Sequence, residues 1–184
     1  KFSALQFFKS NYKNILMTNN ITSNSFRIII ISDTHGVMHE KIYNLIEASD
    51  YVIHAGDILD ESILLNIEKM CSKLFAVNGN NDFYPTLNDT EQINTPLGDI
   101  VVTHGHKHYP DYHDSLRKTF PDALAIIYGH THHHIIDTAR RPYIINPGAA
   151  GNTRTQGGSS CAILNVNNNN LSIQLSKFNY EHHT

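Results

Sequence analysis

Seven side chains able to bind a metal ion recur along the chain, in five groups about 25 residues apart. They are two carboxylates, one amide and four imidazoles: Asp33, His35, Asp57, Asn80, His104, His130 and His132. Nitrogen and oxygen ligands without a thiolate favour Mn²⁺, Fe²⁺ or Zn²⁺ over Cu(I), and over an all-oxygen cage for Ca²⁺. Seven ligands exceed the needs of one tetrahedral ion, so the count predicts two ions that share a bridging carboxylate. Such a pair, about 3.5–4 Å apart, can hold a hydroxide and clamp a phosphate.

Each group of ligands comes directly after a short apolar segment that predicts a β-strand. The first, from Arg27 to Ser32, is an Ile-rich run without polar alternation, typical of a strand buried on both faces of a parallel sheet. Helices are predicted over residues 40–48, 61–70 and 115–120. One strand-helix or hairpin unit takes about as many residues as separate the ligand groups. We therefore expect the ligands to meet at one edge of the sheet, beyond the C-terminal strand ends.

The order of the predicted elements indicates an α/β fold, a layered sandwich with mixed β-sheets flanked by helices. Further strands are predicted over residues 51–54, 74–77, 93–95, 99–103, 125–128, 135–138, 143–146, 161–166 and 171–175. The domain is expected to span residues 26–178, with a C-terminal tail over 179–184. Residues 1–25 contain three Lys, no acid and an Asn/Ser/Thr-rich end, which indicates an extension or flexible linker. Met17 is a candidate native start, and an organellar presequence is the alternative.

Composition excludes several classes of protein. The 184 residues are 40% hydrophobic and 17% charged, as in an ordinary single globular domain. A net charge of −3 predicts no strong nucleic-acid-binding surface and no attraction to an anionic membrane. No apolar run reaches the roughly 18 residues of a membrane-spanning helix. Cys71 and Cys161 follow no metal or redox spacing, so we expect two reduced thiols and a cytoplasmic location.

Six motifs in a fixed order identify a family resemblance: DTHG, HAGD, NGNND, THGH, GHTH and INPGA. Over residues 26–177 they resemble the calcineurin-like metallophosphoesterases, and within that family the small single-domain YfcE-type phosphodiesterases. The resemblance implies the calcineurin-like fold, with a metal cluster at the C-terminal strand ends, and activity with Mn²⁺ or Ni²⁺. It implies one ion held by Asp33, His35, Asp57 and His132. It implies a second held by Asp57, Asn80, His104 and His130, and a phosphate-facing Arg154.

One departure from the wider family concerns the proton given to the leaving group. Many members have Gly-Asn-His where this chain has Gly79-Asn80-Asn81, and that His can protonate the departing oxygen. An amide cannot serve as a general acid at neutral pH. The YfcE-type proteins also lack this His, so the departure fits that subgroup. It predicts weak activity on esters with poor leaving groups.

The predicted function is metal-dependent hydrolysis of a small phosphodiester. In the predicted mechanism a hydroxide that bridges the two ions attacks phosphorus in line. Asp57, Asn80 and His104 help to hold the ions. The ions and Arg154 neutralise the charge that develops on the phosphoryl oxygens. The alternative is a protein-binding scaffold resembling the retromer subunit of this fold, although that subunit has Asp in place of Asn80. A third possibility is that the seven side chains form a hydrogen-bonded cleft that binds no metal. No base-stacking platform is recognisable around the ligands. The resemblance also implies a homo-oligomer, because small members of the family often associate.

Overall fold

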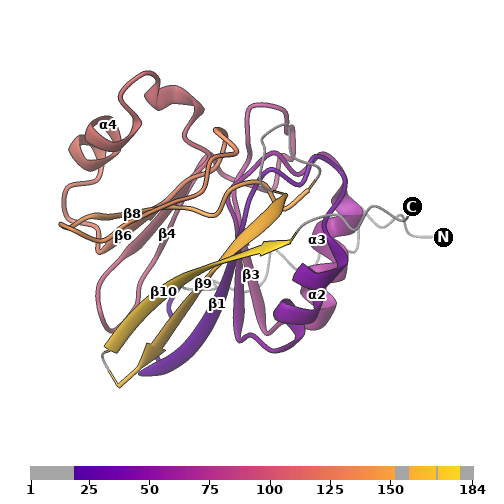
Figure 1. Ribbon diagram of the computed structural model, residues 1–184, viewed down its shortest axis with the longest axis horizontal. Coiled ribbons are helices and arrows are strands. Elements are labelled where there is room, and N and C mark those ends of the chain that lie inside the picture. Colours follow the sequence, from indigo (N-terminus) through magenta and orange to yellow (C-terminus); the bar gives the residue numbers. More distant parts are fainter. Residues whose placement is uncertain (1–18, 152–157, 169, 179–184) are drawn as a thin grey trace.

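Two five-stranded sheets lie face to face, with helices on the outer face of each (Figure 1). The computed structural model describes residues 19–151, 158–168 and 170–178. The first sheet has the order β10-β9-β1-β2-β3: Asn170–Phe178, Ser159–Asn167, Ser25–Ile31, Tyr51–His54 and Lys73–Ala76. The second has the order β4-β5-β6-β8-β7: Thr90–Ile93, Ile100–Thr103, Ala125–Ile127, Tyr143–Asn146 and Ile135–Asp137. The predicted layered α/β sandwich with mixed sheets is confirmed.

Strand β1 is buried on both faces, as its run of Ile predicts. Ile28 and Ile30 point into the core between the sheets, whereas Ile29 and Ile31 point toward the helices, and all four are fully buried. Apolar residues on both faces of the strand explain why its sequence shows no polar alternation. The sheet around it is mixed rather than parallel, because β1 pairs in parallel with β2 and antiparallel with β9.

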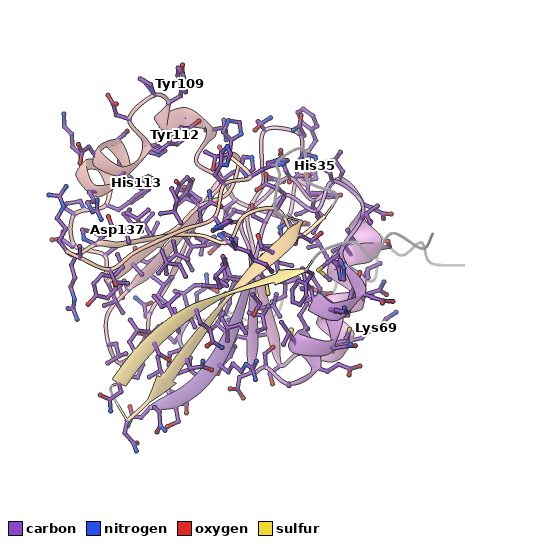
Figure 2. The ribbon with its side chains drawn as sticks, viewed as in Figure 1. His35, Lys69, Tyr109, Tyr112, His113 and Asp137 are labelled. Carbon is purple, nitrogen blue, oxygen red and sulfur yellow. The ribbon has the colours of Figure 1, made fainter. Side chains whose placement is uncertain are left out.

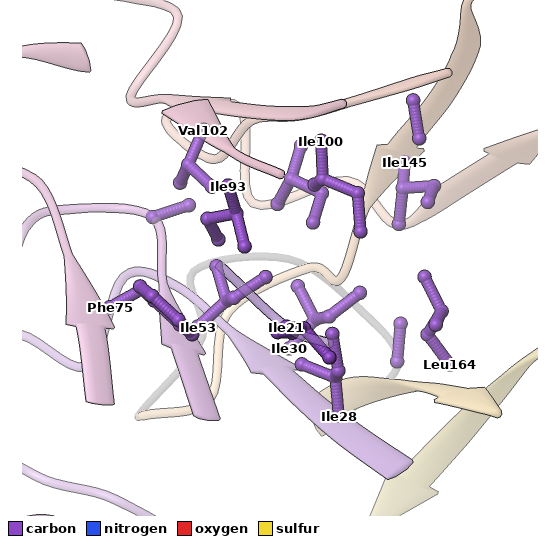
Figure 3. Packing of buried hydrophobic residues seen from close by; sticks show 14 of the residues in the cluster. Ile21, Ile28, Ile30, Ile53, Phe75, Ile93, Ile100, Val102, Ile145 and Leu164 are labelled. Carbon is purple, nitrogen blue, oxygen red and sulfur yellow. The ribbon is translucent and has the colours of Figure 1, made fainter. Parts of the chain in front are cut away.

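Three apolar layers fix the sheets and helices relative to one another. The central layer joins Ile28, Ile30 and Ile53 of the first sheet to Ile100 and other residues of the second (Figure 3). Helices α2 (Glu40–Glu47) and α3 (Glu61–Met70) cover the outer face of the first sheet. Helix α4 (Tyr112–Thr119) covers the second, after a 3₁₀ turn, η1 (His106–His108). Because both sheets are packed on both faces, the ligand-bearing loops start from rigid strand ends.

Several elements differ from their predicted boundaries: β4 ends at Ile93, where the predicted strand over 93–95 begins, and β9 and β10 are longer than predicted. Two further differences concern packing. Helix α4 begins at Tyr112, three residues before the predicted start, so Tyr112 and His113 are helical. The prediction was wrong because its apolar pattern began near Leu116, whereas Tyr112 packs at the edge of the same layer. Within the predicted N-terminal linker, Ile21 is buried in the central core and its amide donates to the carbonyl oxygen of Asn94 at 2.8 Å. The described residues 19–25 therefore pack with the domain.

No helix among the described residues is long and apolar enough to cross a membrane. Residues 1–18, with Met17, and the predicted tail at 179–184 lie outside the described residues.

Candidate metal centre

The seven predicted ligands come together where strand ends of the two sheets meet. Three loops of the first sheet supply them after β1, β2 and β3: Asp33, His35, Asp57 and Asn80. Two loops of the second sheet supply the others after β5 and β6: His104, His130 and His132. The prediction of a single sheet edge is corrected, since the site joins two sheets. A strand-helix unit and a hairpin unit have similar lengths, so the spacing could not separate the two arrangements.

Distances among these side chains suit shared coordination. The Nε2 atoms of His35 and His132 lie 3.1 Å apart, and Nε2 of His132 lies 3.4 Å from Oδ1 of Asp33. Oδ2 of Asp57 lies 3.7 Å from Nε2 of His35 and 3.4 Å from Nε2 of His104. Two overlapping groups each bring their ligand atoms within 4.8 Å of one another: Asp33, His35 and His132, and Asp33, Asp57 and His104. Asp57 thus contacts both halves of the site.

Five of the seven ligands have left-handed backbone conformations. The φ angles are 53° at Asp33, 47° at His35, 55° at Asp57, 65° at His130 and 58° at His132. This conformation costs about 1–2 kcal/mol for each residue with a Cβ atom. Such strain persists only where the surrounding structure fixes it, and it gathers at functional sites. The fold therefore holds these side chains in place before any ion binds.

His104 is oriented to present one ring nitrogen to a metal ion. Its Nδ1 donates to the carbonyl oxygen of Ala55 at 2.8 Å, which leaves Nε2 facing Asn80 Oδ1 at 3.1 Å and Asp57. A carbonyl bound to the far nitrogen is the usual support of a metal-ligating histidine. Burial alone would lower the pKa of His104, but the hydrogen bond to Asp57, the charges of Asp33 and Asp57 and the bond to Ala55 together raise it. The donor set and its support therefore fit a divalent ion.

Asn81 holds the carboxylate of Asp57. Its backbone amide donates to Oδ1 at 3.0 Å, and its side-chain amide donates to Oδ2 at 2.8 Å. Burial would raise the pKa of Asp57, but hydrogen bonds from His104 and Asn81 overcome burial and lower that pKa. These hydrogen bonds keep Asp57 ionised and fix the orientation of its carboxylate. From the sequence alone, Asn81 is visible only as a replacement for a general acid, because its partner Asp57 lies in another loop.

A sequence model of the calcineurin-like phosphoesterase superfamily domain matches residues 26–169. This chain belongs to that superfamily. The probable metallophosphoesterase YsnB of Bacillus subtilis is 30% identical over 159 residues, which cover 80% of this chain and 88% of YsnB. A phosphodiesterase of Methanocaldococcus jannaschii is 28% identical over 141 residues, covering 66% of this chain and 82% of the relative.

A solved structure of a sorting protein shares the same fold. Vps29 of Entamoeba histolytica, solved in complex with Zn²⁺, has a TM-score of 0.70 and 21% identity, covering 83% of this chain and 98% of Vps29. The resemblance to the calcineurin-like phosphoesterases found in the sequence is thus confirmed in family and in fold.

A second layer of polar residues supports the candidate metal centre. The buried carboxylate of Asp82 accepts from the backbone amides of Ile58, Leu59 and Gly79, tying the loops after β2 and β3 together. His54 accepts from the amide of Gly56, so its Nε2 donates to Thr34 Oγ1 at 3.0 Å. Burial lowers the pKa of His54 to about 4, so this histidine is neutral.

The Asn-Pro-Gly turn of the superfamily supports the loop of His130. Asn146 Nδ2 donates to the carbonyl oxygen of Gly129 at 2.8 Å and to Thr131 Oγ1 at 3.1 Å. His106 lies beside the ligands, with its ring centroid 5.6 Å from that of His104, and its buried Nδ1 has no partner among the described residues. Arg154 lies outside the described residues, so its predicted role stays a prediction.

Removing the Asn81 side chain tests its support of Asp57. We expect Asn81→Ala to lower Mn²⁺ affinity about 10- to 100-fold, the usual effect of losing a partner that orients a metal ligand. Isothermal titration calorimetry with Mn²⁺ measures this directly. Asn44→Ala, the same change on the exposed side of α2, is the matched control and should leave affinity unchanged. Equal affinities in both variants would show that the bonds to Asp57 do not matter for the ions.

Proposed function

We propose that the protein is a phosphodiesterase that uses two divalent metal ions. Asp33, His35, Asp57 and His132 would hold one ion, and Asp57, Asn80, His104 and His130 the other. The observation that supports this most strongly is the convergence of seven side chains, five of them on left-handed backbone. Asp33, His35, Asp57, His104 and His132 form the two overlapping groups, and Asn80 and His130 lie against His104. The superfamily match and the phosphodiesterase among the relatives agree with it.

The ligand set determines which ions and which substrates suit the site. The imidazole ligands suit Ni²⁺, Fe²⁺ or Zn²⁺, and the carboxylate and amide oxygens suit Mn²⁺. The resemblance to the YfcE-type proteins makes Mn²⁺ the first candidate among these ions. When bound, such ions activate water and neutralise charge on a phosphoryl group. The two carboxylates, Asp33 and Asp57, cannot neutralise two divalent ions when the histidines are neutral. The loaded site therefore keeps a positive charge that attracts an anionic phosphodiester.

The residues of the chain position the ions but offer little help to a leaving group. Asn81 is committed to Asp57 through two hydrogen bonds. It carries no proton that it can release at neutral pH. Esters whose leaving oxygen is already a weak base are therefore the best substrates.

The test is release of nitrophenol from bis-p-nitrophenyl phosphate by protein loaded with Mn²⁺. We expect turnover that is lost on chelation and restored by Mn²⁺. A protein that binds the ions without hydrolysing this diester would contradict the proposed activity.

Arg154 is tested separately, because the resemblance assigns it a contact with phosphate rather than with metal. Arg154→Ala should lower kcat/KM for the same diester and leave the Mn²⁺ content unchanged, since one charge-assisted hydrogen bond to the phosphoryl group is lost. Arg141→Ala, at an exposed position, is the matched control. An unchanged kcat/KM in Arg154→Ala would show that Arg154 takes no part in turnover.

A protein-binding scaffold is the second candidate, and one observation favours it. Four large apolar side chains are exposed on loops that also carry ligands: Val37 (48%), Leu59 (49%), Phe83 (89%) and Tyr109 (78%). Apolar residues gathered at one end of a soluble domain are typical of an interaction surface. A second copy of the chain is one such partner, which light scattering would reveal. The scaffold would be favoured by two results together: loss of association in Phe83→Ser, and no Mn²⁺-dependent turnover by the wild type.

A further inference from the structure

An open cavity of about 620 Å³ lies beside the metal centre. Helix α4 forms one side of it, and the segment from Tyr128 to Ile135 forms the other. This segment also carries the ligands His130 and His132, with Thr131 of the cavity wall between them. The ring of Tyr112 lies 6.4 Å from that of His130 between centroids. A group attached to a phosphate at the metal centre is therefore within reach of the cavity.

Aromatic rings build the wall nearest the metal centre. Tyr112 stacks on the buried Tyr128 with centroids 5.9 Å apart and an angle of 20° between the rings. His113 meets Tyr128 edge to face, and its Nε2 lies 3.2 Å from the Tyr128 hydroxyl. Figure 2 shows Tyr112 and His113 on the same side of the molecule as Asp137, with Tyr109 above them. Fixed rings of this kind lose little conformational entropy when they bind a ligand.

The charges in the cavity disfavour a second anionic group. Arg117 is the one Arg or Lys among the described residues that line it, and its guanidinium is bound to Asp137 at 2.7 Å. Its Nε also donates to the carbonyl oxygen of Pro142 at 3.1 Å. Asp111 and Asp114 add carboxylates. These charges disfavour an anionic occupant, and the apolar faces of the aromatic wall suit an uncharged ring.

Thr131 offers a hydrogen-bond donor to that occupant. Its Oγ1 already accepts from Asn146 Nδ2 at 3.1 Å and from the amide of His133 at 3.2 Å. A hydroxyl accepts about two hydrogen bonds and donates one. The O–H of Thr131 is therefore left to donate, and the described residues give it no acceptor. A ligand with an acceptor at its edge would satisfy it.

We propose that this cavity binds the planar ring of one ester group of the substrate, an uncharged ring with a hydrogen-bond acceptor at its edge, as in a nucleobase. This inference rests on the proposed phosphodiesterase function and names the class of its substrate. The phosphate would lie at the metal ions and the nucleoside in the cavity. A plain aryl group shares the ring but lacks the acceptor for Thr131.

Three diesters with the same leaving group distinguish a nucleoside from a plain aryl group as the occupant of the cavity. They are p-nitrophenyl phosphates whose second ester group is methyl, phenyl or thymidine 5′. Since nitrophenol leaves in every case, differences in kcat/KM report the second group. Base stacking on aromatic residues supports a preference of about 5- to 150-fold for the thymidine ester over the methyl ester. Phenyl should fall between the two.

Variants then assign that preference to residues. Tyr112→Leu should bring the thymidine-to-methyl ratio of kcat/KM close to one, whereas Tyr112→Phe should keep it. Thr131→Val should lower the thymidine ester toward the phenyl ester, and Thr131→Ser should restore it. Tyr43→Leu changes a half-buried Tyr on α2, which does not line the cavity, and is the matched control. If Tyr112→Leu does not fold, Ile135→Trp fills the cavity from β7 and should likewise abolish the preference.

Binding of thymidine to metal-free protein gives a readout independent of turnover. Saturation-transfer NMR should show contact with the thymine ring in wild type and Tyr43→Leu but not in Tyr112→Leu. Turnover of the methyl ester without any preference for thymidine, and without thymidine binding, would overturn the cavity proposal and leave the phosphodiesterase intact. Thymidine binding without turnover of any diester would overturn the phosphodiesterase. Faster hydrolysis of p-nitrophenyl phosphorylcholine than of the thymidine ester would also overturn the proposed ring.

Discussion

Asp57→Asn is expected to lower the affinity of the protein for both proposed metal ions together. The carboxylate of Asp57 faces His35 on one side and His104 on the other. The amide that replaces it lacks the negative charge that the two proposed ions would share. Changing a partner outside the ligand shell costs about 10- to 100-fold in metal affinity, so losing the bridge should cost more than about 100-fold. Elemental analysis after reconstitution with Mn²⁺ should then find two ions in wild type and fewer than one in the variant.

The control for Asp57→Asn is the same change at an exposed carboxylate. Asp89 pairs with Lys107 at 2.8 Å on the surface, so Asp89→Asn should keep both ions and the activity. Circular dichroism of the metal-free variants separates ion loss from unfolding, because Asp57 also accepts two hydrogen bonds from Asn81. One ion in the wild type, retained in Asp57→Asn, would refute the binuclear site.

The sequence reveals the ligands because their chemistry is local. An apolar strand followed at once by Asp, Asn or His is visible within ten residues, and six motifs in one order identify the family. Burial of β1 on both faces is visible in the same way, through the run Ile28 to Ile31. These features need no knowledge of what lies across the molecule.

The remaining features depend on contacts between distant segments. Asn81 meets Asp57 only because β2 and β3 are neighbours, and Tyr112 meets Tyr128 only because α4 packs on the second sheet. The aromatic wall therefore lies beside the metal centre although the sequence shows no stacking motif. The division of the ligands between two sheets is hidden for the same reason, since each unit has a similar length.

The second large effect concerns the leaving group. Asn81→His would restore the residue that many superfamily members have, but the structure shows that it would also remove the bond from Asn81 to Asp57. Any gain for poor leaving groups is thus set against weaker metal binding. The wild type is the better system for measuring what the missing acid costs.

We expect hydrolysis by the wild type to depend steeply on the pKa of the leaving alcohol. General acid catalysis contributes about 10²–10⁴-fold. Phosphodiesters with one methyl group and one other alkyl group should therefore react more slowly than the matched methyl nitrophenyl diesters. The ratio of their kcat/KM values should exceed the ratio of their uncatalysed rates by at least this factor. The slope is measured from log kcat/KM across methyl aryl diesters with graded phenol pKa, with alkaline hydrolysis of the same esters as the reference. Phosphate monoesters should also be poor, because the described residues place no cation beside Asn81 to match their extra charge. A slope no steeper than that of a superfamily enzyme with His at this position would mean that another group delivers the proton, because Asn81, fixed on Asp57, cannot.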